Sequence, residues 1–563
     1  MSAIDWVVLL GSLVGIVCYG LWRSRGRQDV HGYLLAGKTM PWYAMALSIM
    51  ATQASAITFI STTGQSYVDG MRFVQFYFGL PIAMVVLSAT AVPIFHRTRV
   101  YTAYEYLEQR FDAKTRALVS VIFLIQRGLA VGIALYAPAI VLTVILGWPD
   151  RVTTILMGSL VVLYTTLGGI KAVTWTEFVQ MLIMMLGLVA ALVTAVWLLP
   201  PDVSLFDAVS LAGAAGKLNP VVWDFNLSDR YNVWSGLVGG AFLALAYFGC
   251  DQSQVQRYLT GKSIAQSRLS LLFNAVAKIP MQFFILFIGS IVFVFYTFEQ
   301  PPLLFQPHDL ARARAAGSDF ENLNGRYEAA FAERRAAARD YLTASRNGDP
   351  AATEAGVRRY RTAQERVDGA RAEGAALAAR DGGEPVNDTN YIFVTFVTRY
   401  MPAGVVGLMI AMIFAAAMSS ISAEINSLAT VTVIDLYQRH VKPAATGMHY
   451  LTVSRLATVF WGAYAVVTAE YGKNLGALIE AVNMLGSLFY GGLVGVFALA
   501  FFFKRVGGTA AFLGVIAGEA AIFAARFLTG ITFLWFNVIG CAVVIATALA
   551  VTRLLGPRRP PGT

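Results

Sequence analysis

The run AAAMSSISAEINS, residues 415–427, places four serines, a glutamate and an asparagine directly after the apolar stretch VVGLMIAMIF. At helical spacing, Ala416, Ser419, Ser420 and Ala423 share one face. Small side chains expose backbone carbonyls and hydroxyls add further oxygens, which together suit a small hard cation. The alternative is that small residues and serines let two membrane helices pack closely. Spacing alone does not separate the two interpretations.

Two other apolar stretches are interrupted by polar residues. One is SIMATQASAITFISTTGQSY (48–67), and the other is ALAYFGCDQSQ (244–254), which contains Gly249, Asp251 and Gln252. Interrupted segments in corresponding positions of two halves of a chain indicate the midplane site of a transporter. They strengthen the interpretation of 415–427 as part of a cation site.

Charged side chains inside apolar segments are costly and therefore candidates for function. Arg127 and Lys278 each lie near the middle of such a segment, and either could neutralise Asp251 or meet an anionic substrate. The alternatives are a structural ion pair for Arg127, and for Lys278 a side chain that extends to the inner membrane face. Aromatic residues that could wall a pocket, or only pack, are Phe59, Phe76, Tyr77 and Tyr247.

The composition predicts a membrane protein. The chain has 563 residues, of which 57% are hydrophobic and 13% charged, whereas charged residues make up about a quarter of a soluble protein. A bilayer span needs about 20 apolar residues and must be helical. We therefore expect an all-α bundle of thirteen spans, at 4–22, 42–66, 74–96, 117–147, 150–169, 176–199, 233–250, 268–297, 402–436, 449–470, 475–503, 509–527 and 533–554.

Basic residues predict the orientation, because they concentrate in cytoplasmic loops. Their pattern places the N-terminus outside and the C-terminus in the cytoplasm of a bacterial inner membrane. It also accounts for the net charge of +10 without a nucleic-acid partner. The series comprises Arg23, Arg25, Arg27, Lys38, Arg97, Arg99, Arg110, Lys114, Arg116, Arg257, Lys262, Arg268, Arg439, Lys442, Lys504, Arg505, Arg558 and Arg559.

Residues 300–388 are rich in Ala, Arg and Glu, and the stretch RNGDP breaks them into two helical pieces. We interpret them as an extracytoplasmic helical hairpin inserted between membrane parts 1–299 and 389–563. A variable insertion is favoured over a partner-docking element. The three cysteines lie in separate spans, and no cluster or nucleophile motif indicates an enzyme or a cofactor.

The interrupted segments open two runs of five spans, two to six and seven to eleven. Because five is odd, the second run is inverted relative to the first. The motifs YLLAGKTMPWYAMALSIMATQASAITFIS, TAYEYLEQRF, TTLGGIKAVTWTEFVQ, DQSQVQRYL and AAAMSSISAEINSLATVTVIDLY together resemble the sodium:solute symporter family. The stretch LYAP (135–138) is most similar to the iodide, multivitamin and monocarboxylate carriers. The resemblance implies a LeuT-type core with one helix before it and two after.

The resemblance also implies a sodium site. Its ligands would be the carbonyls of Ala51, Ala54 and Ala416 and the hydroxyls of Ser419 and Ser420.

A second sodium site, present in some members, would use Ser419, Ser422, a hydroxyl at 423 and an aspartate at 177. This chain has Ala423 and Glu177 there, which favours one coupled sodium. Glu177 would then serve cation exit, or pair with Lys171.

For the solute, the resemblance indicates a pocket near Thr58, Tyr77, Asp251 and Lys278. Sugar carriers of the family have a lysine at position 278, but glutamine and glutamate at positions 58 and 77, which argues against a simple hexose. We expect a sodium-coupled symporter that imports a small organic solute or anion by alternating access, without a cofactor. The alternatives are a membrane-embedded solute sensor and proton coupling through Glu177 or Asp251.

Overall fold

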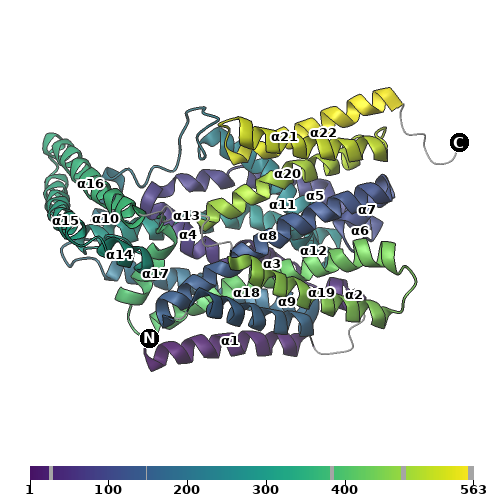
Figure 1. Cartoon of the computed structure of the whole chain (residues 1–563), viewed down its shortest axis with the longest axis horizontal. Helices are drawn as coiled ribbons and strands as arrows, with labels where there is room; N and C mark the ends of the chain where they lie inside the picture. The colour runs from purple at the N-terminus through teal and green to yellow at the C-terminus, as the bar shows by residue number, and fades with distance from the viewer. Residues whose placement is uncertain (25–29, 148, 381–385, 471–476, 556–563) are drawn as a thin grey trace.

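The computed structural model describes residues 1–24, 30–147, 149–380, 386–470 and 477–555. Within these ranges the chain is helical and forms no strand, apart from an isolated bridge between Met40 and Gly261. Most of the long helices run along the long axis of the molecule and form one bundle (Figure 1). Four residues of the basic series, Arg25, Arg27, Arg558 and Arg559, lie outside the described ranges.

The bundle has the dimensions of a membrane domain. Among the described residues, ten helical segments are long and apolar enough to cross a bilayer, from Ala3–Arg23 to Phe533–Leu555. Two shorter apolar helices, Arg151–Leu167 and Ser235–Gly249, fall on predicted spans. The all-α membrane class is thus confirmed, while the count of thirteen spans stays a prediction.

The first half contains a broken helix at its centre. Helix α3 ends at Gln53, Ala54 leaves the helical conformation with a ψ of 71°, and α4 begins at Ala56. The predicted interruption of 48–67 is therefore a break in the backbone. The elements of this half are α1 (Ala3–Arg23), α2 (Val30–Leu35), η1 (Ala36–Lys38), α3 (Trp42–Gln53), α4 (Ala56–Asp69), η2 (Gly70–Tyr77), α5 (Leu80–Ala89), α6 (Ala91–Thr98), α7 (Ala103–Arg110), α8 (Ala113–Leu146), α9 (Asp150–Trp197) and α10 (Leu205–Ala214).

The second half opens with a matching break. Helix α11 ends at Gly249, and the Asp251 side chain caps α12 by accepting a 2.9 Å hydrogen bond from the Ser253 N–H. Helix α18, which carries the serine-rich run, is buried along nearly its whole length. The elements of this half are η3 (Ser235–Gly239), α11 (Gly240–Gly249), α12 (Gln252–Leu259), α13 (Ile264–Phe298), α17 (Thr389–Tyr400), α18 (Val405–Val431), η5 (Thr432–Val441), α19 (Gly447–Ala469), α20 (Leu478–Phe502), α21 (Gly508–Leu528) and α22 (Phe533–Leu555).

The predicted insertion forms α14 (Pro307–Arg314) and a long antiparallel pair, α15 (Ser318–Arg346) and α16 (Pro350–Ala378). The turn falls at RNGDP, where Asp349 caps α16 through the N–H groups of Ala351 and Ala352. The pair is fixed to the bundle: buried Arg334 donates a 2.5 Å hydrogen bond to the Tyr296 carbonyl near the end of α13. The boundaries of the three parts stay a prediction.

The two ends of the bundle differ. The N-terminus lies at the end that carries the α14–α16 insertion, whereas α6 and α7 lie at the opposite end, where α22 also finishes (Figure 1). The basic pattern predicts this relative placement of the insertion and the two chain ends. Which end faces the cytoplasm stays a prediction.

Candidate cation and solute site

The break between α3 and α4 meets the serine-rich face of α18. The Ser419 hydroxyl lies 3.0 Å from the Ala51 carbonyl oxygen and 2.9 Å from that of Ala416. The Ser420 hydroxyl donates to the Thr52 carbonyl at 2.9 Å. The last carbonyls of a helix lack intrahelical partners, so the hydroxyls of α18 satisfy them here.

The structure thus brings Ala51, Ala416 and Ser419 together at one point. Ala54 caps α3 and is fully buried, directly beyond the last helical residue. Carbonyl and hydroxyl oxygens from two helices, shielded from water, are the kind of ligands that a hard cation takes.

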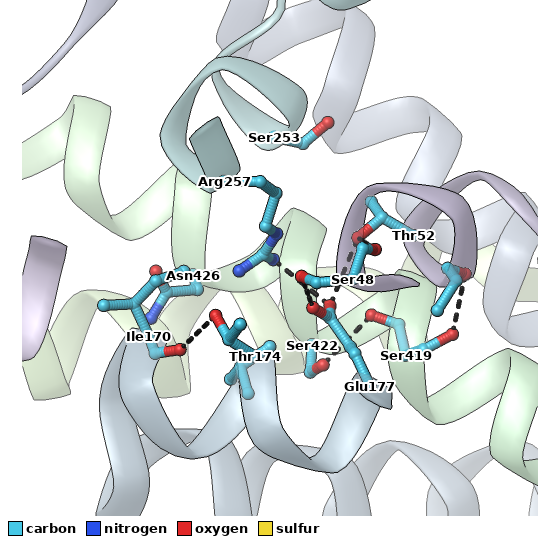
Figure 2. A network of polar contacts seen from close by, with 12 residues as sticks. Ser48, Thr52, Ile170, Thr174, Glu177, Ser253, Arg257, Ser419, Ser422 and Asn426 are labelled. Atoms are coloured by element: carbon cyan, nitrogen blue, oxygen red, sulfur yellow. Dashed lines mark hydrogen bonds and ion pairs between the residues drawn. The ribbon is translucent and has the colours of Figure 1, made fainter. Parts of the chain in front are cut away.

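A second polar cluster surrounds Glu177 on α9. Its carboxylate accepts hydrogen bonds from the Ser48 hydroxyl and, at 3.2 Å, from the Thr52 hydroxyl (Figure 2). The Arg257 guanidinium of α12 lies 3.4 Å away, and both charged side chains are fully buried. Glu177 is therefore paired with Arg257, and the alternative of a pair with Lys171 is wrong.

This pairing also corrects the basic series. The series places Arg257 in a cytoplasmic loop, but the residue lies within helix α12 and is 1% exposed. Arg257 lies in the second turn of α12, the helix that begins after the break, and its side chain points toward Ser48 of α3 and Glu177 of α9 (Figure 2). Ser422 and Ala423 belong to the same region: the Ser422 hydroxyl donates to the Ser419 carbonyl at 3.1 Å, and Ala423 offers only a methyl group.

Arg127 of α8 forms the centre of a buried ion-pair cluster. It donates to Asp251, to Glu424 at 2.9 Å and to the Tyr490 hydroxyl at 2.6 Å. Tyr490 in turn donates to Asp251 at 3.0 Å. The structural ion pair expected for Arg127 is confirmed. Because buried charges are stable only when paired, this cluster links α8, α18 and α20 at the break before α12.

A small cavity of about 80 Å³ lies between these clusters. Of the predicted pocket residues, Thr58 and Tyr77 line it, whereas Asp251 and Lys278 are not among its lining residues. Fully buried Lys278 lies with its Nζ 5.6 Å from the Tyr77 ring centroid, so the alternative that it reaches the inner face is wrong.

Other lining residues include aromatic and amide side chains. Of the four aromatic residues for which both a pocket role and packing were open, Phe76, Tyr77 and Tyr247 wall the cavity, whereas Phe59 packs elsewhere in the core. Gln53, Gln126 and Asn483 supply amide groups that the sequence analysis did not single out. Gln53 belongs to the interrupted stretch 48–67, which is a local signal in the sequence, whereas Gln126 and Asn483 carry no comparable local signal.

A helical membrane bundle with two broken helices, and with a set of buried oxygens at one break, is the architecture of an ion-coupled secondary transporter. The model of the sodium:solute symporter family matches residues 33–321 and 371–518. The chain belongs to this family. The gap between the two matched ranges, 322–370, falls within the α15–α16 hairpin.

Individual relatives agree with this assignment. The sodium/sialic acid symporter NanT of Aliivibrio fischeri is 28% identical over 97% of this chain and 92% of the relative. Human sodium-coupled monocarboxylate transporter 1 is 28% identical over 92% of this chain and 72% of the relative. The relatives thus include the predicted branch of monocarboxylate carriers. They also include sialic acid symporters, which the motifs did not indicate and which have the same sequence identity to this chain.

A solved structure has the same fold. It is the substrate-bound outward-open state of a Na⁺-coupled sialic acid symporter, with a TM-score of 0.77, 25% identity and 99% of both chains covered. The protein is therefore a multi-pass, sodium-coupled symporter of a small organic solute, with the predicted symporter fold and with Na⁺ as its coupling ion.

Proposed function

We propose that this symporter couples the uptake of a small organic carboxylate to one sodium ion, held between α3 and α18. The ligands are the carbonyls of Ala51, Ala54 and Ala416 and the hydroxyls of Ser419 and Ser420. The observation that carries the proposal is the contact of Ser419 with the Ala51 and Ala416 carbonyls, at 3.0 and 2.9 Å. A bound sodium would replace these hydrogen bonds by coordination, which joins the broken helix to α18.

The proposal of a single sodium rests on the surroundings of Glu177. A second cation there would need a free carboxylate, but this one already faces the Arg257 guanidinium at 3.4 Å and accepts from two hydroxyls. Ala423 also offers no oxygen beside Ser422. Arg257 thus supplies the positive charge that a second sodium would otherwise bring.

The carboxylate part of the proposal rests on the first turn of α4. Ser55, Ile57 and Thr58 line the cavity at the N-terminal end of this helix. Helix N-termini present unpaired N–H groups and a positive dipole to an anion, as half-helices do in transporters. The relatives named above include carriers of sialic acid and of monocarboxylates, and both classes of solute bear a carboxylate.

The direction of transport follows from the predicted orientation. With the N-terminus and the α14–α16 insertion outside a bacterial inner membrane, solute and sodium bind from outside, and the bundle then opens to the cytoplasm. A sodium gradient directed inward drives this cycle.

The test uses purified protein in liposomes, with labelled N-acetylneuraminate, pyruvate and lactate as candidate solutes. Uptake is measured with an inward sodium gradient and with potassium in place of sodium. The primary amide of each acid is the matched control, because it removes the charge and keeps nearly the same size. Sodium-dependent uptake of one acid but not of its amide supports the proposal, whereas equal sodium-dependent uptake of acid and amide would exclude a carboxylate-specific site.

A further inference from the structure

A second, separate hollow lies at the end of the bundle opposite the insertion. It is a groove of about 670 Å³ between the C-terminal ends of α20 and α22, reached also by the loop that connects α20 to α21. Its basic lining residues are Lys504, Arg505 and Arg553. Its apolar wall includes Phe502 and Leu549, which are 61% and 37% exposed.

The three basic side chains of this groove have no acidic partner within the described part of the chain. No carboxylate lines the groove, and none forms an ion pair with any of the three. Two other basic residues of the predicted inner loops do have acidic partners: Arg116 pairs with Asp435, and Arg439 pairs with Glu108. The groove therefore concentrates positive charge that no residue in the described ranges neutralises.

The loop that carries two of these residues is held in place. Arg110 at the end of α7 donates to the Phe503 carbonyl at 2.8 Å and to that of Val506 at 3.3 Å. The backbone around Lys504 and Arg505 is thus tied to the core of the bundle. The groove can therefore offer one ligand two different surfaces. One is a fixed cluster of cationic side chains, and the other is formed by the exposed apolar side chains beside it.

We infer that this groove binds an anionic phospholipid of the adjacent leaflet. The phosphate lies among Lys504, Arg505 and Arg553, and an acyl chain packs on Phe502 and Leu549. Basic pockets between helices at a membrane face bind such headgroups, and a free phosphate would make no use of the apolar wall. The helices involved, α20 to α22, lie at the edge of the bundle (Figure 1), where lipid has access.

The experiment measures retained lipid by native mass spectrometry of the purified full chain. The protein is titrated with phosphatidylglycerol, with phosphatidylcholine of the same acyl chains, and with inorganic phosphate. The test variant combines Lys504→Gln, Arg505→Gln and Arg553→Gln. The matched control combines Arg97→Gln, Lys262→Gln and Lys442→Gln, which removes the same charge from exposed residues outside the groove.

The test variant should bind phosphatidylglycerol at least about tenfold more weakly, because each basic side chain near a membrane surface contributes roughly fivefold. The control variant should bind it like the unmodified protein, and phosphatidylcholine should bind weakly to all three. All six positions are exposed, and equal thermal unfolding in detergent will verify that the variants are folded. Equal loss in test and control variants, or displacement of the lipid by millimolar inorganic phosphate, would overturn the inference.

Discussion

Replacement of Ser419 by alanine tests the sodium site directly. The Ser419 hydroxyl is fully buried and lies within 3.0 Å of two backbone carbonyl oxygens, those of Ala51 and Ala416. The variant keeps the helix and the small volume of the side chain, but it removes one of the proposed sodium ligands. We expect apparent sodium affinity to fall while the maximal rate of uptake changes less.

The expected loss of sodium affinity follows from the charge of the sodium ion that the Ser419 hydroxyl would contact. A hydrogen-bonding group that interacts with a charged partner contributes about 1.5–3 kcal/mol, which corresponds to a roughly 10- to 150-fold change in affinity. Ser420→Ala should act in the same direction, because its hydroxyl meets the next carbonyl, that of Thr52.

The matched control is Ser427→Ala on the same helix. The Ser427 hydroxyl is also fully buried, but it donates only to the Glu424 carbonyl of its own helix, at 2.8 Å. The assay is the sodium concentration that gives half-maximal solute uptake into proteoliposomes. If Ser427→Ala weakened sodium dependence as much as Ser419→Ala, the serines of α18 would act through helix packing and the site would be refuted.

Three further predictions concern stability. Glu177→Gln leaves the Arg257 guanidinium buried without a counter-charge, so the variant should lose about 3–5 kcal/mol of stability and unfold at lower temperature in detergent. The Arg346 guanidinium, which donates to Asp207, holds the pKa of that carboxyl well below its usual range. This contact should therefore persist at neutral pH and weaken only in acid. The weakening should be measurable as faster hydrogen exchange at the tip of the α15–α16 pair. Arg334→Met removes the hydrogen bond to α13 and should speed exchange in α15 and α16.

Each of these predictions has a contradicting outcome. An unchanged unfolding temperature for Glu177→Gln would mean that Arg257 has another partner. The sign of the pH effect follows from the depressed pKa of Asp207, since stability is present above the unfolded-state pKa and lost as pH falls toward the folded-state pKa. An Asp207→Asn variant that keeps the same acid sensitivity would refute the assignment of this pH effect to Asp207. If Arg334→Met speeds hydrogen exchange in α20 as much as in α15 and α16, the cause is general unfolding and not the loss of this one hydrogen bond.

The sequence predicted those parts of the site that depend on local pattern. Polar residues that interrupt an apolar run mark a helix break, so both breaks were predictable, as was the α18 face that presents Ser419. The hairpin turn at 346–350 was likewise predictable, because Asn, Gly, Asp and Pro together stop one helix and cap the next.

Ion pairs between residues that are distant in the sequence were harder to predict. Arg257 was grouped with the cytoplasmic residues because a basic residue near the end of an apolar segment is usually exposed. It is buried because α12 begins anew after the break and turns this side chain toward Glu177, which lies far away in the sequence. Glu424 was noticed in the serine-rich run, but its partner, Arg127, is set by the packing of α8 on α18. Such pairs depend on the tertiary structure.

The effect of membrane voltage on uptake tests the central claim most directly. One sodium ion and one monocarboxylate carry no net charge, so an inside-negative potential should leave sodium-driven uptake of the transported acid unchanged. With two sodium ions, one positive charge would cross per cycle, and about 100 mV would add about 2.3 kcal/mol to the driving force. The account predicts uptake that requires sodium and ignores voltage. Uptake that rises steeply with an imposed potassium diffusion potential, or that proceeds without sodium, would contradict it.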